Sequence, residues 1–274
     1  MLTTPEMFML AALLVGVGLF GGVLSGLLGV GGGIVIVPAL YHVFSYLDID
    51  LSLRMHMAVG TSLATIIPTS IRSVRSHHKR GAVDTALLRQ WAIPLFIGVL
   101  IGTVIAVFVA KGGALTFIFA TVALLVAAQM AFVPHTWTLR SSVPGGVGGA
   151  LPPVGIGAIS AMMGIGGGTL AVPTLSAFGV PIHRAVATAA GFGLIIAVPG
   201  AIGFIAGGWN DPVPAYSLGY VSLLGFALIV PATLLAVPWG VALAHRLKPQ
   251  PLRWAFALFL ALTSLRMYWD LFGH

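Results

Sequence analysis

In its first long apolar segment the chain reads Gly22-Val-Leu-Ser25-Gly-Leu-Leu-Gly29-Val-Gly31-Gly32-Gly33-Ile-Val-Ile-Val-Pro-Ala-Leu40, and 135 positions later it reads Gly157-Ala-Ile-Ser160-Ala-Met-Met-Gly164-Ile-Gly166-Gly167-Gly168-Thr169-Leu-Ala-Val-Pro-Thr-Leu175. Chance easily aligns leucines between two apolar segments, but not a serine, a glycine triplet and a proline in one register. We interpret this as an internal duplication, with residues 1–140 as the first membrane repeat and 141–274 as the second.

The composition identifies the class of protein in which this duplication sits. The 274 residues are 58% hydrophobic and only 7% charged, whereas about a quarter of the residues in a soluble domain are charged. This excludes a soluble enzyme, a disordered chain and a fibrous protein, and predicts an all-α polytopic membrane protein. The absence of cysteine excludes disulfides, thiolate metal sites and a cysteine nucleophile. The net charge of +7 fits basic loops on the cytoplasmic side better than a nucleic-acid partner.

Apolar stretches predict where the chain meets the bilayer. We find eight, at approximately 7–44, 55–74, 85–110, 113–133, 146–180, 185–207, 215–244 and 252–271. Six have the length of one crossing, whereas the first and fifth are too long for one helix and are interrupted by the glycines. The first is also too long for the apolar part of a signal peptide, so we expect a retained membrane segment.

The basic residues favour one topology over another. If all eight stretches crossed once, the 13 Lys and Arg residues would divide 7 to 6 between the two sides, with no bias. If the first and fifth stretches instead turn back at their glycines, the division becomes 10 to 3. This predicts two inverted repeats, each a glycine-broken helical hairpin or re-entrant segment followed by three membrane helices. Both termini are then expected outside.

The duplicated glycine breaks are the candidate binding site. A short helix that restarts after each break, near Ile34 and Thr169, presents N–H donors and about half a positive charge at its N-terminus. Two such ends meeting near the midplane make an anion site without lysine or arginine. The alternative is close packing, which we favour for Gly18, Gly22 and Gly26 because small residues let membrane helices approach. A nucleotide-binding loop is excluded, because no strand precedes these glycines and no Lys-Ser or Lys-Thr follows them.

The chain resembles the TauE/SafE-type sulfite exporter family of membrane permeases. The resemblance rests on the duplicated glycine motif, on Ala58-Val-Gly-Thr61-Ser62-Leu after it, and on a basic loop that reaches Gly81-Ala-Val-Asp84. It implies a secondary transporter, an exporter of sulfite or a small organosulfonate, in the bacterial inner membrane, with a sulfur-containing anion and the lipid bilayer as partners. Carried over by position, and extended to polar neighbours of the breaks, the expected substrate-binding residues are Ser25, Gly29, Gly31, Gly32, Gly33, Thr61, Ser62, Ser160, Gly164, Gly166, Gly167, Gly168, Thr169 and Thr188.

The two halves are not identical at this site, and other functions stay open. The second half has Phe192-Gly193 where the first has Thr61-Ser62, which predicts an asymmetric site. The alternatives are an uptake permease for another small solute, such as an organic acid or a metal ion, and a membrane scaffold that transports nothing. We expect no enzyme, because no nucleophile–base pair or acidic dyad lies within a segment. We expect no metal site and no cofactor, and leave homo-oligomerisation open.

Overall fold

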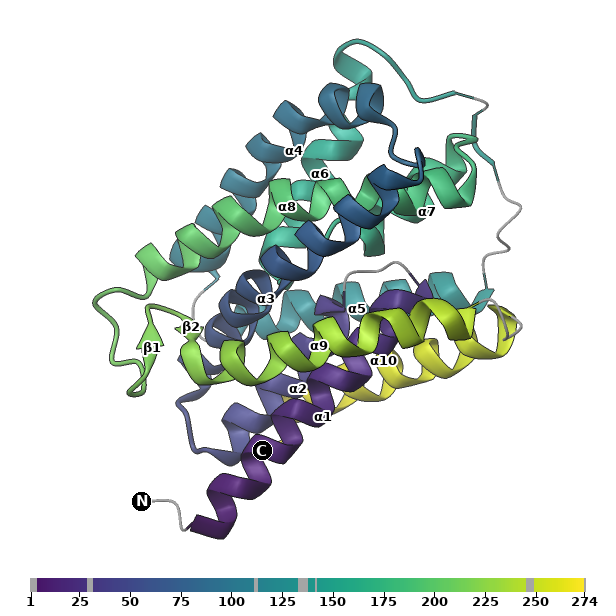
Figure 1. Ribbon diagram of the computed structural model, residues 1–274. Coiled ribbons are helices and arrows are strands. Elements are labelled where there is room, and N and C mark those ends of the chain that lie inside the picture. Colours follow the sequence, from purple (N-terminus) through teal and green to yellow (C-terminus); the bar gives the residue numbers. More distant parts are fainter. Residues whose placement is uncertain are drawn as a thin grey trace.

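The computed structural model is a bundle of helices (Figure 1), described for residues 4–28, 32–110, 113–132, 138–140, 142–244 and 249–273. In the first half it contains α1 (Thr4–Leu28), α2 (Gly33–Tyr46), α3 (Leu51–Lys79), α4 (Thr85–Val104), a π-helical turn η1 (Ile105–Val109) and α5 (Ala114–Phe132). In the second half it contains a 3₁₀ turn η2 (Val147–Gly149), α6 (Leu151–Met163), α7 (Gly168–Ala177), α8 (Ile182–Gly207), α9 (Leu223–Ala244) and α10 (Pro249–Phe272). A short antiparallel hairpin, β1 (Ser217–Leu218) and β2 (Val221–Ser222), connects α8 to α9.

Six of the described helices are long and apolar enough to cross a bilayer. They are α1, α4 with η1, α5, α8, α9 and α10. Large apolar side chains on these helices, such as Phe96, Leu125 and Leu258, are exposed, as expected for surfaces that face lipid tails. Trp209 and Trp269 are also exposed, close to helix ends, where tryptophan prefers the membrane–water interface. The predicted all-α, multi-pass membrane architecture is confirmed.

Both long apolar stretches are interrupted at their glycines, as predicted, but the arms before the two breaks differ in length. α1 has 25 residues, enough to cross a membrane, whereas α6 has 13. Pro152 and Pro153 lie in the first turn of α6, a position that favours proline because an N–H group there has no intrahelical partner. The half-helices after the breaks are both short, 14 residues in α2 and 10 in α7.

Glycines let the long helices approach one another closely. α1 packs along α9, where a Cβ added to Gly18 or Gly22 would lie 2.7 or 2.6 Å from the carbonyl oxygen of Ile229 or Thr233. α4 packs in the same way along α6, and a Cβ on Gly98 would lie 2.1 Å from the Val154 carbonyl oxygen. The packing role expected for Gly18 and Gly22 is therefore confirmed.

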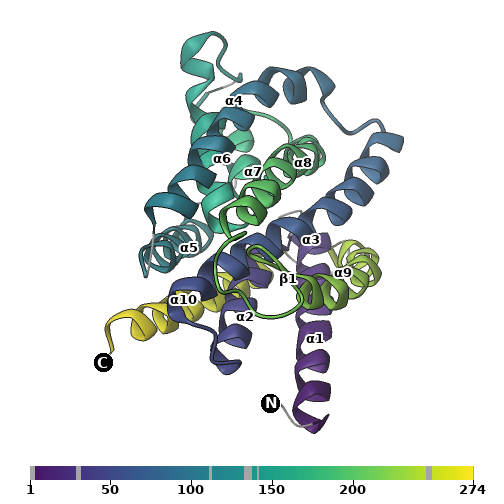
Figure 2. The same cartoon turned by 90° about the vertical axis from the view of Figure 1, so that its left-hand side faces the viewer.

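α3 and α8 cross in the middle of the bundle and run in opposite directions (Figures 1 and 2). Gly60 lies against Phe204, whereas ten positions further along α3 Ser70 lies against Gly193. α5 and α10 are also antiparallel. Near the middle of α5, the Thr121 hydroxyl lies in a hydrogen bond of 2.6 Å with the Tyr268 hydroxyl, and at the end of α5 the Phe132 ring makes an edge-to-face contact with the Trp254 ring. Each pair joins one helix from each half of the chain.

The loops separate into two groups at opposite ends of α3, whose 29 residues span roughly 43 Å. At the N-terminal end of α3, its first turns meet η1, the hairpin and the C-terminal end of α10, and Asp50, Asp211 and Asp270 gather there. At its other end lie the 80–84 loop and the start of α8, joined by an Arg184–Asp84 ion pair of 3.1 Å. Loops that the charge pattern predicts to share a side therefore share an end of the bundle.

Candidate substrate site at the two glycine breaks

The two glycine breaks touch each other. α2 begins at Gly33, directly after Gly32, whose φ of +67° lies in the left-handed region that favours glycine. A Cβ added to Gly33 would lie 2.6 Å from the carbonyl oxygen of Gly164 and 3.0 Å from the Cα of Ile165. The backbone of the first break therefore rests on the backbone of the second, and only glycine at position 33 permits this approach.

Gly164 is held from three directions. It ends α6 with a φ of +64°, and a Cβ on it would lie 2.8 Å from the Cα of Val59 in α3. Its carbonyl oxygen accepts a buried hydrogen bond of 2.7 Å from the Ser62 hydroxyl. The same oxygen is the atom that faces Gly33, so Ser62, Gly164 and Gly33 form one contact across the two halves.

The second half-helix begins beside α8. Gly166, Gly167 and Gly168 are all buried, and a Cβ on Gly167 would lie 2.7 Å from the Cβ of Phe192. In the described part of the chain neither α2 nor α7 has a side-chain cap at its start. The first-turn N–H groups of both half-helices are thus directed toward the region of the breaks, at the positive ends of the helix dipoles.

The remaining expected residues divide into those that lie at the breaks and those that bond elsewhere. Ser160 is buried one turn before Gly164, and its hydroxyl has no partner among the described residues. Ser25 lies half-buried in α1, with its Cβ 3.6 Å from the position that a Cβ on Gly32 would take. Thr169 is buried in the first turn of α7. Gly29 and Gly31 lie outside the described residues.

Thr61 and Thr188 are buried but bonded to loops. The Thr61 hydroxyl accepts a 2.9 Å bond from the backbone N–H of Ser222, which fastens α3 to the β hairpin. The Thr188 hydroxyl accepts a 3.0 Å bond from the backbone N–H of Asp84, before α4. Both hydroxyls act in this structure as ties between α3 or α8 and the opposite half of the chain.

The asymmetry expected from Phe192-Gly193 is visible around the breaks. Phe192 stacks on Trp91 with ring centroids 5.5 Å apart, and Gly193 leaves room for the Ser70 hydroxyl. Ser62, from the first half, contributes a hydroxyl to the contact between the breaks. Sequence reasoning missed Val59, because it packs through its backbone, and no side-chain type signals such a contact.

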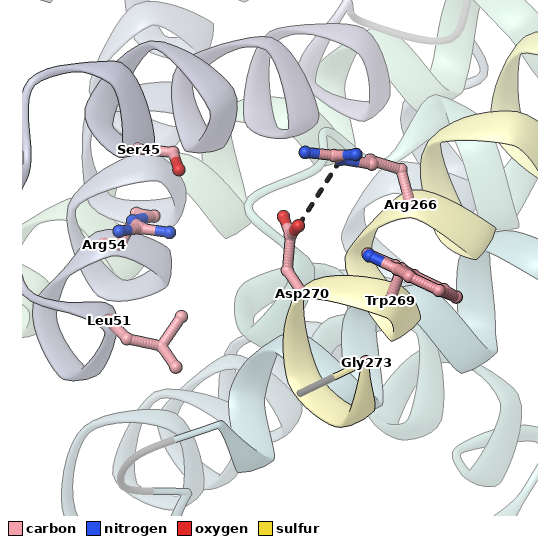
Figure 3. Close-up of a pocket in the computed structure, with 7 residues that line it drawn as sticks. All are labelled: Ser45, Leu51, Arg54, Arg266, Trp269, Asp270 and Gly273. Atoms are coloured by element: carbon pink, nitrogen blue, oxygen red, sulfur yellow. Dashed lines mark ion pairs between the residues drawn. The ribbon is translucent and has the colours of Figure 1, made fainter.

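Two cavities lie at the ends of the bundle, away from the breaks. One of about 370 Å³ (Figure 3) lies at the N-terminal end of α3 and is lined by Ser45, Leu51, Arg54, Arg266, Trp269, Asp270 and Gly273. Figure 3 shows Arg266 paired with Asp270, at 3.4 Å, while Arg54 extends from the opposite wall. The other, of about 540 Å³, lies at the opposite end of α3 and is lined by Pro68, Ile71, Arg72, Arg75, Ser76, Lys79 and Leu234.

Positive charge predominates in both cavities. In the first, two arginines face one aspartate, and the Arg54 guanidinium is kept in place by a 3.0 Å bond to the Ile49 carbonyl and by the Tyr41 ring, 5.5 Å away. In the second, three cations line the wall with no acidic residue. Within the described ranges, no three His, Asp or Glu side chains are grouped to hold a metal ion.

Comparisons with known proteins agree over nearly the whole chain. Residues 14–267 match the family described as Sulfite exporter TauE/SafE. A probable membrane transporter protein of Haemophilus influenzae is 36% identical, over 95% of this chain and 98% of the relative. Similar proteins described in the same words occur in Methanocaldococcus jannaschii, at 28% identity over 96% and 97% of the two chains, and in Bacillus subtilis, at 25% over 94% and 97%. No solved structure matches.

Proposed function

This chain belongs to the sulfite exporter TauE/SafE family and is a multi-pass membrane transporter rather than an enzyme, and on that basis we propose that it exports sulfite or a small organosulfonate. The observation that carries the proposal is the contact between Gly33 and Gly164. α2 begins at this contact, and α7 begins four residues after Gly164, so we place the anion where the N-terminal N–H groups of both half-helices can reach it. A small oxyanion bound there is held mainly by backbone dipoles.

The bound anion takes the place of the contact between Gly33 and Gly164. In this structure the Gly164 carbonyl oxygen faces Gly33 and accepts a hydrogen bond from the Ser62 hydroxyl, which leaves little space between the breaks. When an anion enters, Gly164 moves aside, and the Ser62 hydroxyl becomes available as a donor to an oxyanion oxygen. Neither a lysine nor an arginine is among the described residues that form this contact, which keeps binding weak enough for release.

Movement between the two sides uses the inverted duplication. Helices that correspond in the two repeats are antiparallel: α3 opposes α8, and α5 opposes α10. Helices that correspond in the two repeats also have corresponding neighbours. By position in the repeat, α1 corresponds to α6 and α4 corresponds to α9. α1 packs along α9, and α6 packs along α4. This pattern supports two halves that rock against each other around the breaks, which alternately open the cavity at either end of α3.

Both cavities favour anions, and the membrane potential sets a direction. The three cations around Arg72 at the inner end raise the local concentration of an anion, and Arg54 and Arg266 do so at the outer end. An inside-negative potential contributes about 2.3 kcal/mol per charge per 100 mV toward anion exit. Export from the cytoplasm across the bacterial inner membrane therefore needs no nucleotide hydrolysis.

The test is flux through the purified protein in liposomes. Liposomes loaded with labelled sulfite or methanesulfonate should release it faster with the wild-type protein than without protein, under an inside-negative potential. Gly33→Leu should abolish release, because the leucine side chain would need the space that the Gly164 carbonyl oxygen fills. Gly16→Leu is the matched control, since nothing lies within 4 Å of a Cβ at Gly16. Flux of a carboxylate or a divalent metal ion without flux of either sulfur anion would contradict the proposal.

A further inference from the structure

His56 is buried in α3 between two carbonyl oxygens. The residue as a whole is 3% exposed. The Nδ1 atom lies 3.0 Å from the Ser52 carbonyl oxygen of its own helix, and the Nε2 atom lies 2.9 Å from the Ala106 carbonyl oxygen of η1. A π-helical turn is uncommon, and here it directs a main-chain carbonyl out of the helix and onto the imidazole.

The two partners determine which form of the ring fits. A neutral imidazole has one N–H donor and one lone pair, whereas an imidazolium has two donors. A carbonyl oxygen only accepts, so the neutral ring satisfies one contact and turns a lone pair toward the other oxygen. Only protonated His56 can donate to both carbonyl oxygens.

The groups around the ring suit a positive charge. The Tyr220 ring lies 5.0 Å from the imidazole, centroid to centroid, and the Phe204 ring lies 6.4 Å from it. The Tyr220 hydroxyl donates to the Asp211 carboxylate, so a negative charge is held next to this aromatic group. The facing parts of the other neighbours, η1 and residues 191–207 of α8, contain no ionisable residue.

The charged groups on the same helix are occupied elsewhere. The Arg54 guanidinium bonds the Ile49 carbonyl, and the Asp50 carboxylate accepts from the Ser52 N–H and hydroxyl. Asp211 is thus the charged group that faces His56 from the hairpin segment. His56 is also six positions before Ser62 on α3, the residue that bonds the glycine break.

We propose that His56 binds the coupling proton of this transporter. The inference rests on the proposed function. A proton arriving from the outer end adds to the free lone pair of the ring and forms the second N–H bond, which joins α3 to η1 through the Ala106 carbonyl. When the proton leaves, a lone pair faces that oxygen and the junction weakens. Because α3 also carries Ser62, the protonation of His56 biases the arrangement of α3 at the breaks.

Two measurements test this in the intact protein. The first is solid-state or detergent NMR with ¹⁵N-labelled histidine, in which His56→Gln identifies the His56 signals. We expect a doubly protonated ring that loses one proton within about pH 5 to 8. A ring that stays a single neutral tautomer throughout this range would overturn the proposal, whether or not the protein moves sulfite.

The second measurement is flux of methanesulfonate, which remains an anion across this range, with the membrane potential clamped. The wild-type rate should change about tenfold between outside pH 6 and pH 8, with an accompanying pH change in the lumen. His56→Gln should transport with less than about a twofold pH effect and no lumenal change. His78→Gln, at an exposed position in the last turn of α3, is the control and should behave as wild type. An unaltered pH profile in His56→Gln would contradict the coupling role.

Discussion

The Ser62 hydroxyl donates a 2.7 Å hydrogen bond to the Gly164 carbonyl oxygen, across 102 positions of sequence and from one half of the chain to the other. The bond lies where α6 stops and the second glycine break begins. It is thus a polar tie between the halves at the point where we place the substrate.

Removing this tie should reduce transport more than it reduces folding. Ser62→Ala leaves the buried Gly164 carbonyl without its donor, at a cost of about 1–3 kcal/mol, and also removes a donor to the anion. We expect a loss of sulfite efflux of about fivefold to about a hundredfold, for an effect of that size. Thr69→Ala is the matched control, because the Thr69 hydroxyl bonds only carbonyls of its own helix among the described residues. Equal efflux by the two variants would contradict the role of Ser62.

The contact between the breaks can be tested with a single methyl group. Gly33→Ala places a Cβ 2.6 Å from the Gly164 oxygen and 3.0 Å from the Cδ1 of Ile66, so the breaks must separate. We expect loss of efflux and a lower midpoint of thermal unfolding. Gly16→Ala has open space around it and should be stabilising by a few tenths to about 1 kcal/mol, with normal efflux. Normal efflux by Gly33→Ala would show that the breaks do not need this approach.

The inner cavity should act through its charge. Changing Arg72, Arg75 and Lys79 together to glutamine removes the cations that line it and should raise the KM for anion taken from the inner side by about tenfold at low salt. The difference should shrink as ionic strength rises, because salt screens exposed charges. Arg140→Gln, which does not line this cavity, is the control. A change in maximal rate with no change in KM would point to a structural role instead.

Topology can be measured without background, because the chain has no cysteine. Single variants Tyr216→Cys in the hairpin and Ser76→Cys near the end of α3 place thiols at exposed positions of opposite ends. A membrane-impermeant maleimide should label Tyr216→Cys in intact cells, and Ser76→Cys only after the membrane is opened. Labelling of both from the same side would refute the inverted arrangement of the halves.

The Tyr220 phenol should lose its proton only at a higher pH than an ordinary tyrosine. Burial, and then the hydrogen bond to Asp211, raise the pKa of the Tyr220 phenol above its ordinary value of about 10. A raised pKa means that its contribution to stability is complete below about pH 10 and is lost only as the pH rises through the folded value. The tyrosinate absorbance of the wild type and of Tyr220→Phe should therefore be equal up to about pH 11. Above that pH, or after unfolding, the wild type should absorb more by the amount of one ionised tyrosine.

Much of the architecture follows from hydropathy and from the glycine repeat. The ends of α4 with η1, of α5 and of α8 agree with the predicted apolar stretches within a few residues, because a bilayer demands a fixed apolar length. The glycine breaks were predictable for a similar reason, since a helix with Gly166, Gly167 and Gly168 in succession is unstable. α6 has prolines in its first turn and ends at Gly164, whose φ is +64°, and α7 begins at Gly168.

The interior of the candidate site was less accessible to sequence reasoning. Thr61 and Thr188 were expected near the anion, yet both bond backbone N–H groups of the opposite half. A hydroxyl that ties two helices and one that binds a ligand have the same residue type and the same burial. His56 gave no signal at all, because its partners are main-chain carbonyls, which every residue possesses.

The interlocking of the breaks also governs how the protein is made. Gly33 closes against Gly164, and Ser62 bonds the same residue, so the first 140 residues enter the membrane well before their partner atoms are synthesised. Until the ribosome has translated α6, the nascent first half holds an open break and an unpaired buried hydroxyl in the bilayer. Assembly must therefore end with the second half, and a truncated chain carrying only the first half should be a substrate for membrane quality control unless the missing half is supplied in trans.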